Sequence, residues 1–228
     1  MYKPFENYHP SRSAIPYHIG IIPDGSRRWA KEHRTSYYEA YNLALGKLSV
    51  LINYIFGFGV SEISIYLAST QNFTRPQNEL NELFRAVYTF LINIQDIIKI
   101  YSVNINYCGN EYLLPNDISN QMTILREMTK ENVSKRLNIC IAYNPLYEIW
   151  ESAKKSSTPS DFLNNLWVKT PLDLVIRTGK ANLISNFLIL QSGFARMYFI
   201  DKLFNDIQIS DIKQIMDTFK KNERKYGE

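Results

Sequence analysis

The stretch best suited to chemistry is residues 23–29, with the sequence PDGSRRW, which follows a short apolar run and is typical of a helix start. Backbone N–H groups at a helix start attract phosphate, Gly25 permits close approach, and Arg28 can bind two phosphate oxygens at once. A carboxylate such as Asp24 beside an anion is explained by a bridging Mg²⁺, which takes one carboxylate plus phosphate oxygens. The alternative left open by these residues is an Asp-Gly turn before a solvated basic turn.

A second polar stretch, residues 69–76 with the sequence STQNFTRP, links two apolar elements. Arg75 could supply another phosphate clamp, while Ser69, Gln71 and Asn72 offer neutral donors and acceptors near a reacting carbon. The same polar groups could instead cap the backbone of an ordinary loop.

The third stretch is residues 173–180, DLVIRTGK, followed by SNF at residues 185–187. Arg177 emerges from an apolar strand, where an unpaired guanidinium would be costly, so we expect it to meet an anion or an acid. One such motif is weak evidence by itself. Three arginine-bearing motifs, each at the end of a predicted strand, favour a diphosphate site over three unrelated loops.

The elements that must position these motifs are short buried strands separated by helices. Helical spacing of apolar residues predicts helices over residues 41–56, where Gly57 suits the C-cap, and over residues 80–94. Strands alternating with helices pair in parallel, so the predicted fold is α/β with one open sheet covered by helices. Ligands of such sheets bind beyond the carboxyl ends of the strands, here the first, second and fifth. The predicted strands are residues 18–22, 63–67, 103–108, 137–143, 172–176 and 197–200.

The 228 residues, 45% hydrophobic and 14% aromatic, can bury one substantial core, and we expect residues 1–228 to form a single domain. Only residues 154–160 are typical of a flexible loop. The N-terminus lacks a signal-peptide pattern, and the apolar run at residues 48–60 is too short and interrupted to span a bilayer. We therefore expect a cytoplasmic protein without stable membrane insertion.

Composition also narrows the partners. Cys108 and Cys140 lie in apolar segments without CxxC spacing, which favours reduced core thiols over a disulfide, metal or nucleophile site. The net charge of +4, with 26 basic residues, is mild. It suits a small anionic substrate and gives no reason to expect nucleic acid.

The motifs IIPDGSRRWA, SxxNFxRP, DLVIRTG with SNF, and the closing NERKYG together resemble the cis-prenyltransferases, the undecaprenyl diphosphate synthase family. The resemblance runs from residue 18 to residue 227. It implies a single open six-stranded parallel sheet flanked by helices, a homodimer, and small-molecule allylic diphosphates as substrates. It also implies Mg²⁺ on Asp24, an allylic diphosphate held by Asp24, Gly25, Arg28 and Arg75, and a second diphosphate held by Arg177 and Ser185.

The departures from the family pattern gather in the second substrate's half. After RTG the family has a glycine, an acid and a clamp arginine, whereas this chain has KANL at residues 180–183. Arg196 stands where the family carries a glutamate thought to help hold Mg²⁺, so it could partly replace the lost clamp but cannot bind metal. Tyr41 stands at the family's histidine position, and Leu67, at a position that lines the product tunnel, should shorten it.

These departures resemble the offshoot that makes lavandulyl and cyclolavandulyl diphosphates by joining two dimethylallyl diphosphates head-to-middle, and this is our leading hypothesis. Three alternatives stay open: head-to-tail condensation with isopentenyl diphosphate, a sesquilavandulyl-type reaction with a longer donor, and a silent subunit of a partner synthase. The expected catalytic residues are Asp24, Tyr41, Ser69, Gln71 and Asn72, with Asp24 also as metal ligand. The expected substrate-binding residues are Gly25, Ser26, Arg27, Arg28, Trp29, Leu67, Arg75, Arg177, Ser185 and Arg196.

Overall fold

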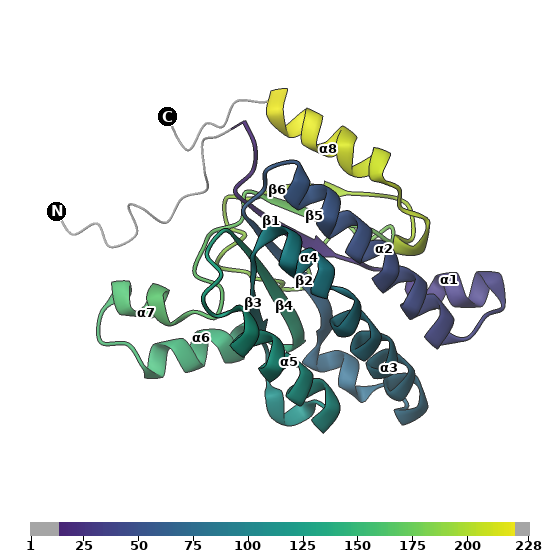
Figure 1. Ribbon diagram of the computed structural model, residues 1–228, viewed down its shortest axis with the longest axis horizontal. Helices are drawn as coiled ribbons and strands as arrows, with labels where there is room; N and C mark the ends of the chain where they lie inside the picture. The colour runs from purple at the N-terminus through teal and green to yellow at the C-terminus, as the bar shows by residue number, and fades with distance from the viewer. Residues whose placement is uncertain (1–13, 222–228) are drawn as a thin grey trace.

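The computed structural model describes residues 14–221, and the NERKYG motif lies outside them. The described chain forms one six-stranded sheet with all neighbouring strands parallel, in the order β3-β4-β2-β1-β5-β6 (Figure 1). The strands are β1 His18–Ile22, β2 Glu62–Ser69, β3 Val103–Cys108, β4 Lys135–Tyr143, β5 Leu174–Arg177 and β6 Arg196–Phe199. The helices are α1 Ser26–His33, α2 Tyr37–Gly57, α3 Gln77–Asn93, α4 Gln95–Tyr101, α5 Asn116–Thr129, α6 Pro145–Lys154, α7 Pro159–Asn165 and α8 Ile209–Lys221, with short 3-10 turns η1 Thr70–Thr74, η2 Glu111–Leu113 and η3 Phe204–Asp206.

The predicted architecture is confirmed, with each of the six strands within two residues of its expected position at either end. The predicted loop at residues 154–160 is shorter, because Thr158 caps a further helix that begins with Pro159. A proline at the first helical position and a capping box with Asp161 start that helix, and both features are sequence signals of a helix start.

Two apolar clusters sandwich the sheet. The larger joins the strands to α2, α3, α5 and α8, through side chains such as Leu48, Leu91 and Leu125. The smaller covers the other face with Val168, Leu172 and residues 187–188. Helices therefore cover one face fully, while the other face is closed largely by the irregular segments on either side of β5. Within the described residues, no helix is long and apolar enough to cross a membrane.

The strand order explains why three distant motifs meet. Strand β1 lies at the centre of the sheet, hydrogen-bonded to β2 on one side and to β5 on the other. Since all three run parallel, their carboxyl ends open onto the same edge of the sheet. The motifs at residues 23–29, 69–76 and 177–187 therefore gather at one place.

Buried polar groups cross the sheet near its amino edge. His18 Nε2 lies 2.8 Å from Ser64 Oγ, Asn138 Nδ2 donates to Ser64 Oγ at 2.9 Å, and Asn106 Nδ2 donates to Asn138 Oδ1 at 2.8 Å. This chain of contacts links β1, β2, β4 and β3 and satisfies polar side chains inside the core. Cys108 and Cys140, paired across β3 and β4, are both free and buried, as predicted, and burial raises the pKa of the Cys108 thiol.

His18 gives the fold a pH dependence. Its ring is fully buried, and desolvation holds its pKa below the ordinary value of 6.5, so the folded state favours the neutral ring. The unfolded chain takes up a proton near pH 6.5, and the free energy of unfolding should therefore fall as pH drops from 6.5 toward the lowered pKa. Urea denaturation of the wild type and His18→Gln between pH 8 and pH 5 measures this. The wild type should show the steeper loss, and equal slopes would rule out His18 as the source.

Candidate active site

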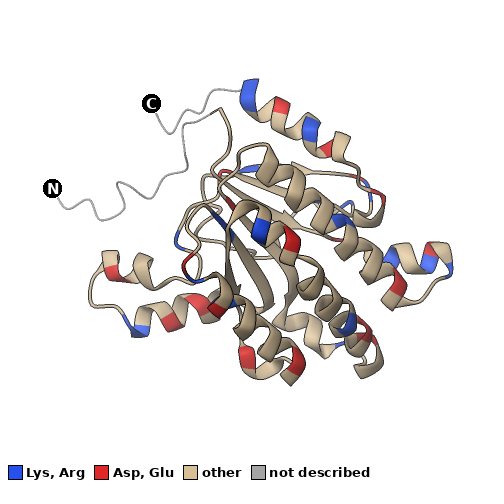
Figure 2. Ribbon diagram, in the orientation of Figure 1, with Lys and Arg blue, Asp and Glu red and all other residues tan. Residues whose placement is uncertain are grey.

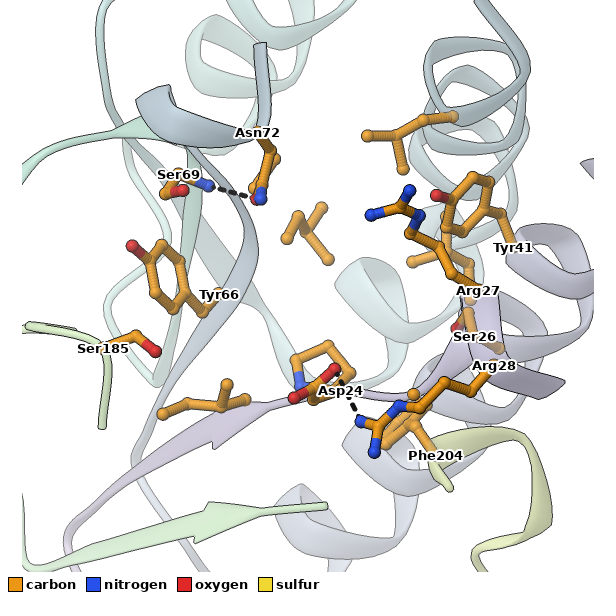
Figure 3. A pocket seen from close by; sticks show the side chains of 18 of the residues that line it. Asp24, Ser26, Arg27, Arg28, Tyr41, Tyr66, Ser69, Asn72, Ser185 and Phe204 are labelled. Carbon is orange, nitrogen blue, oxygen red and sulfur yellow. Dashed lines mark hydrogen bonds and ion pairs between the residues drawn. The ribbon is translucent and has the colours of Figure 1, made fainter. Parts of the chain in front are cut away.

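A cavity of about 500 Å³ opens at the carboxyl ends of β1, β2 and β5. Figure 3 shows its lining side chains pointing inward from α1, α2, β2 and the segment after β5. Its lining carries five basic side chains and one carboxylate, so the cavity is electropositive. These six are Asp24, Arg27, Arg28, Lys31, Arg75 and Arg177. Elsewhere basic and acidic residues are interspersed along the outer helices (Figure 2).

The turn between β1 and α1 forms the floor of this electropositive end. Gly25 has φ +121°, in the region that favours glycine, and a Cβ there would lie 2.9 Å from the Leu203 side chain. Gly25 is also the N-cap of α1 and brings no side chain to its first turn, which holds no acidic residue. The N–H groups of that turn, beside buried Ser26, are positioned for an anion.

Asp24 is held between two arginines. Arg28 Nη2 lies 3.3 Å from its Oδ1, and Arg177 Nη2 donates to its Oδ2 at 2.8 Å. Thr178 fixes the Asp24 backbone, because its hydroxyl donates to the Asp24 carbonyl at 2.8 Å. The carboxylate remains 35% exposed, so it is ordered yet reachable from the cavity.

Arg177 is 8% exposed, and the expectation that it meets an anion or an acid is met by Asp24. Its Nη1 donates to the Leu183 carbonyl at 2.7 Å and to Ser185 Oγ at 2.8 Å. Its Nε has no protein hydrogen-bond partner. The guanidinium thus joins the segment after β5 to Asp24, and its Nε–H can still donate a hydrogen bond.

The opposite wall comes from the end of β2 and from η1. Asn72 Oδ1 accepts from the Ser69 N–H at 2.9 Å, so Asn72 caps this turn as well as lining the cavity (Figure 3). The polar groups of this stretch therefore satisfy backbone, as the loop interpretation predicts, and they also face the cavity together with Gln71. Tyr66, which the sequence patterns did not reveal, lies beside them, stacked on Phe187 with ring centroids 4.8 Å apart. Burial raises the pKa of the Tyr66 hydroxyl to about 12.

Directly behind the third wall, which Arg27, Tyr41 and Arg75 form, lies another residue that sequence reasoning missed. Glu79, on the first turn of α3, is 3% exposed and contacts Arg27, Arg75 and Tyr41. Burial raises the pKa of the Tyr41 hydroxyl above its usual range. That hydroxyl donates to Glu79 Oε1 at 3.1 Å and accepts from Arg75 Nη1 at 3.2 Å. Tyr41 is therefore a neutral phenol, and its hydroxyl hydrogen is bonded to Glu79.

Beyond the charged groups the cavity becomes apolar. Leu67 lies on this part of the lining, together with Ala44, Leu45, Leu83 and Val87. An apolar pocket joined to an electropositive rim fits an ion with a hydrocarbon tail.

The structure does not bring Trp29 and Arg196 to this cavity. Trp29 lies on another face of α1, where its Nε1 donates to Asp206 at 2.9 Å and its ring stacks on His33. Arg196 begins β6, paired with Leu174 at the amino edge of the sheet. Its guanidinium lies 5.4 Å over the Phe219 ring in α8. Parallel strands direct their beginnings away from the edge that receives ligands, which explains the position of Arg196.

The donor set around Asp24 fits a metal that arrives with its substrate. The described residues include no group of three or more His, Cys, Asp or Glu that could hold an ion. Mg²⁺ is usually held by one or two carboxylates together with substrate phosphates and water. The partly exposed Asp24 carboxylate can supply the protein ligand, and a bound diphosphate the others.

A parallel α/β sheet whose central strand ends form an electropositive cavity with an apolar extension is suited to a ligand that joins an anionic group to a hydrocarbon chain. The family model for undecaprenyl diphosphate synthases matches residues 22–227, and the chain belongs to that family, the cis-prenyltransferases. It is a prenyltransferase that makes prenyl diphosphates.

Curated relatives match almost the whole chain. The chain is 28% identical to a ditrans,polycis-undecaprenyl-diphosphate synthase of Buchnera aphidicola, over 98% of this chain and 95% of the relative. It is 29% identical to an isoprenyl transferase of Fusobacterium nucleatum, over 93% of this chain and 96% of the relative.

Two solved structures share the fold. Lavandulyl diphosphate synthase from Lavandula x intermedia, in complex with dimethylallyl diphosphate, matches with a TM-score of 0.88 and 24% identity over 94% of this chain and 99% of that one. A probable undecaprenyl diphosphate synthase from Campylobacter jejuni matches with a TM-score of 0.75 and 24% identity over 93% and 98%.

Proposed function

We propose that the enzyme joins two dimethylallyl diphosphates head-to-middle into a lavandulyl-type C10 diphosphate, which can then cyclise if the cavity folds the bound cation back on itself. The observation that carries this proposal is a second cavity of about 410 Å³ that adjoins the first and has no charged residue in its lining. Tyr66, Ser69, Gln71 and Ser185 belong to both cavities.

The uncharged second cavity matters for orientation. Dimethylallyl and isopentenyl diphosphates carry the same charge, so arginines alone do not choose between them. Two clamps on the acceptor diphosphate would fix the direction in which the acceptor lies. Here Arg177 and Ser185 provide one clamp. Leu183 provides none, because its only contact there is its carbonyl, which accepts from Arg177. The neutral walls then decide which acceptor carbon faces the donor, which allows reaction at a middle carbon.

The donor half supplies the driving interactions. Arg28, Arg75 and the first turn of α1 face the position of the donor diphosphate, and they stabilise it most as it leaves and gains charge. Mg²⁺ bound to Asp24 and to phosphate oxygens would add Lewis-acid neutralisation of the leaving group. The allylic cation is captured by the acceptor's double bond, and a proton is then lost. Because Tyr41 is a neutral phenol whose oxygen already accepts from Arg75, the departed diphosphate is the better-placed base.

The size of the apolar extension supports a short product. Leu67 and its aliphatic neighbours line a cavity of about 500 Å³, a volume suited to a small ligand. The likeness to lavandulyl diphosphate synthase also supports this interpretation. The curated relatives favour head-to-tail condensation instead, since they include undecaprenyl diphosphate synthases, so that reaction is the second candidate.

The homodimer expected from the family resemblance is part of the same proposal. Strand β6 lies at the edge of the sheet and leaves Met197 and Phe199 exposed. Phe194, just before this strand, is 55% exposed. An apolar edge of this kind is suited to cover by a second copy.

Incubation with dimethylallyl diphosphate alone tests the reaction. We expect a C10 diphosphate, identified by mass spectrometry after dephosphorylation, without any isopentenyl diphosphate. The reason is that the second cavity has no charged residue in its lining that would select isopentenyl diphosphate over dimethylallyl diphosphate as the acceptor. A C10 product that forms only when isopentenyl diphosphate is added would contradict the proposal and support head-to-tail condensation.

Two parallel reactions distinguish the proposed enzyme from a sesquilavandulyl-type enzyme and from a silent subunit. Farnesyl or geranyl diphosphate as donor with dimethylallyl diphosphate as acceptor should give little product, and a preference for these donors would indicate a sesquilavandulyl-type enzyme. Purified protein that turns over no allylic diphosphate under any of these conditions would favour a silent subunit.

A further inference from the structure

We infer that Glu79 is a positioning residue, which holds two cavity arginines and Tyr41 in the arrangement that receives the diphosphate. Glu79 Oε1 lies 3.0 Å from Arg27 Nε and 3.4 Å from Arg75 Nη1, and it accepts from the Tyr41 hydroxyl at 3.1 Å. The inference rests on the proposed binding of a diphosphate in this cavity. It adds a residue that itself does not line the cavity.

The contacts of Glu79 join three separate elements. Arg27 belongs to α1, Tyr41 to α2, and Arg75 lies between η1 and α3, whose first turn carries Glu79. A carboxylate in the first turn of a helix is favoured by the helix dipole. The side chain of Glu79 is 4% exposed, so its contacts are shielded from water and salt.

The atoms used by Glu79 leave the binding faces of the arginines available. It contacts Arg27 through Nε, so both terminal nitrogens of that guanidinium stay available to a ligand. It contacts Arg75 through Nη1, the same atom that donates to Tyr41. The Nη2 atom of Arg75 therefore stays available to a ligand. A guanidinium held from behind in this way keeps the paired donors that phosphate recognition needs.

Without Glu79 the two arginines would no longer be ordered before the ligand arrives. Arg27 is 46% exposed and could turn into solvent, and two like charges sharing one acceptor would move apart. A ligand would then have to order two long side chains on binding. Against this stands a simple charge effect, because removal of a negative group should attract an anion more strongly. The two effects have opposite signs, so one measurement separates them.

Glu79→Gln is the test, because glutamine keeps the shape and an acceptor oxygen but removes the charge. Binding of inorganic diphosphate is measured by isothermal titration calorimetry, and steady-state kinetics are measured with dimethylallyl diphosphate. We expect the dissociation constant for diphosphate and the KM to rise by about tenfold, with kcat changed less. Glu79→Asp, which keeps the charge on a shorter side chain, should restore part of the affinity.

Glu62→Gln is the matched control. Glu62 is another buried carboxylate, which accepts from Asn138 Nδ2 at 2.7 Å at the amino end of β2, away from both cavities. Its substitution should lower the unfolding temperature and leave the affinity for diphosphate unchanged.

Unchanged or tighter diphosphate binding by Glu79→Gln would overturn the positioning role, even if the wild type binds and turns over as proposed. The same shift in both variants would also overturn it, because a general loss of stability would then explain the effect. A wild type that binds no inorganic diphosphate would overturn this inference and the proposed site together.

Discussion

Asp24→Asn should lower turnover of allylic diphosphate by about a thousandfold while the protein stays folded. Asparagine keeps an oxygen near Arg177 but loses the charge that can hold Mg²⁺ against the leaving diphosphate. Steady-state kinetics with dimethylallyl diphosphate measure the loss, and chelation of Mg²⁺ from the wild type with EDTA should reproduce it. Residual activity within tenfold of the wild type would contradict the role given to Asp24.

The structure also decides which substitution at Asp24 is informative. Asp24→Ala would leave Arg177, which is 8% exposed, without its acid, and this should cost about 1–2 kcal/mol of folding stability besides the activity. Asp206→Ala is the matched control, since this exposed carboxylate contacts Trp29 outside the cavity. It should retain near-normal kcat and KM.

Gly179→Ala should reduce kcat/KM by about a hundredfold, although the residue carries no functional group. Gly179 has φ +86°, and a Cβ there would lie 2.6 Å from Arg28 Nη2 and 2.9 Å from the Asp24 carbonyl. Both donor-side groups must shift to make room, and backbone strain adds about 1–3 kcal/mol. Kinetics together with the unfolding temperature separate these two effects.

Gly46→Ala is the control for this prediction. Gly46 is an exposed glycine within α2, and a Cβ there meets no atom within 4 Å. Its substitution should leave activity intact and stabilise the helix by up to about 1 kcal/mol. Full activity in Gly179→Ala would mean that Arg28 and Asp24 do not need their present positions.

Local signals in the chain were sufficient for the six strands and for much of the cavity lining. The β1 to α1 turn was predictable because the PDGSRR sequence combines a positive-φ glycine with a helix start. Arg177 was expected to find an acid because an apolar strand cannot leave a guanidinium unpaired. These inferences need only residue type and immediate neighbours.

Residue pairs far apart in the chain could not be predicted in the same way. Glu79 lies 38 residues from Tyr41 in the sequence, and nothing local distinguishes it from an ordinary first-turn acid. Arg196 and Trp29 looked like site residues by motif, but strand direction and helix phase turn them away.

The sequence by itself determined the strands, the α/β class and the family, because propensity, periodicity and motifs are properties of short segments. Only the tertiary structure decided that Asp24 pairs with both Arg28 and Arg177, that Glu79 holds Arg27 and Arg75, and that a neutral cavity adjoins the charged one. The reason is physical: an ion pair depends on distance and burial, and both are set by how the sheet brings separate strand ends together.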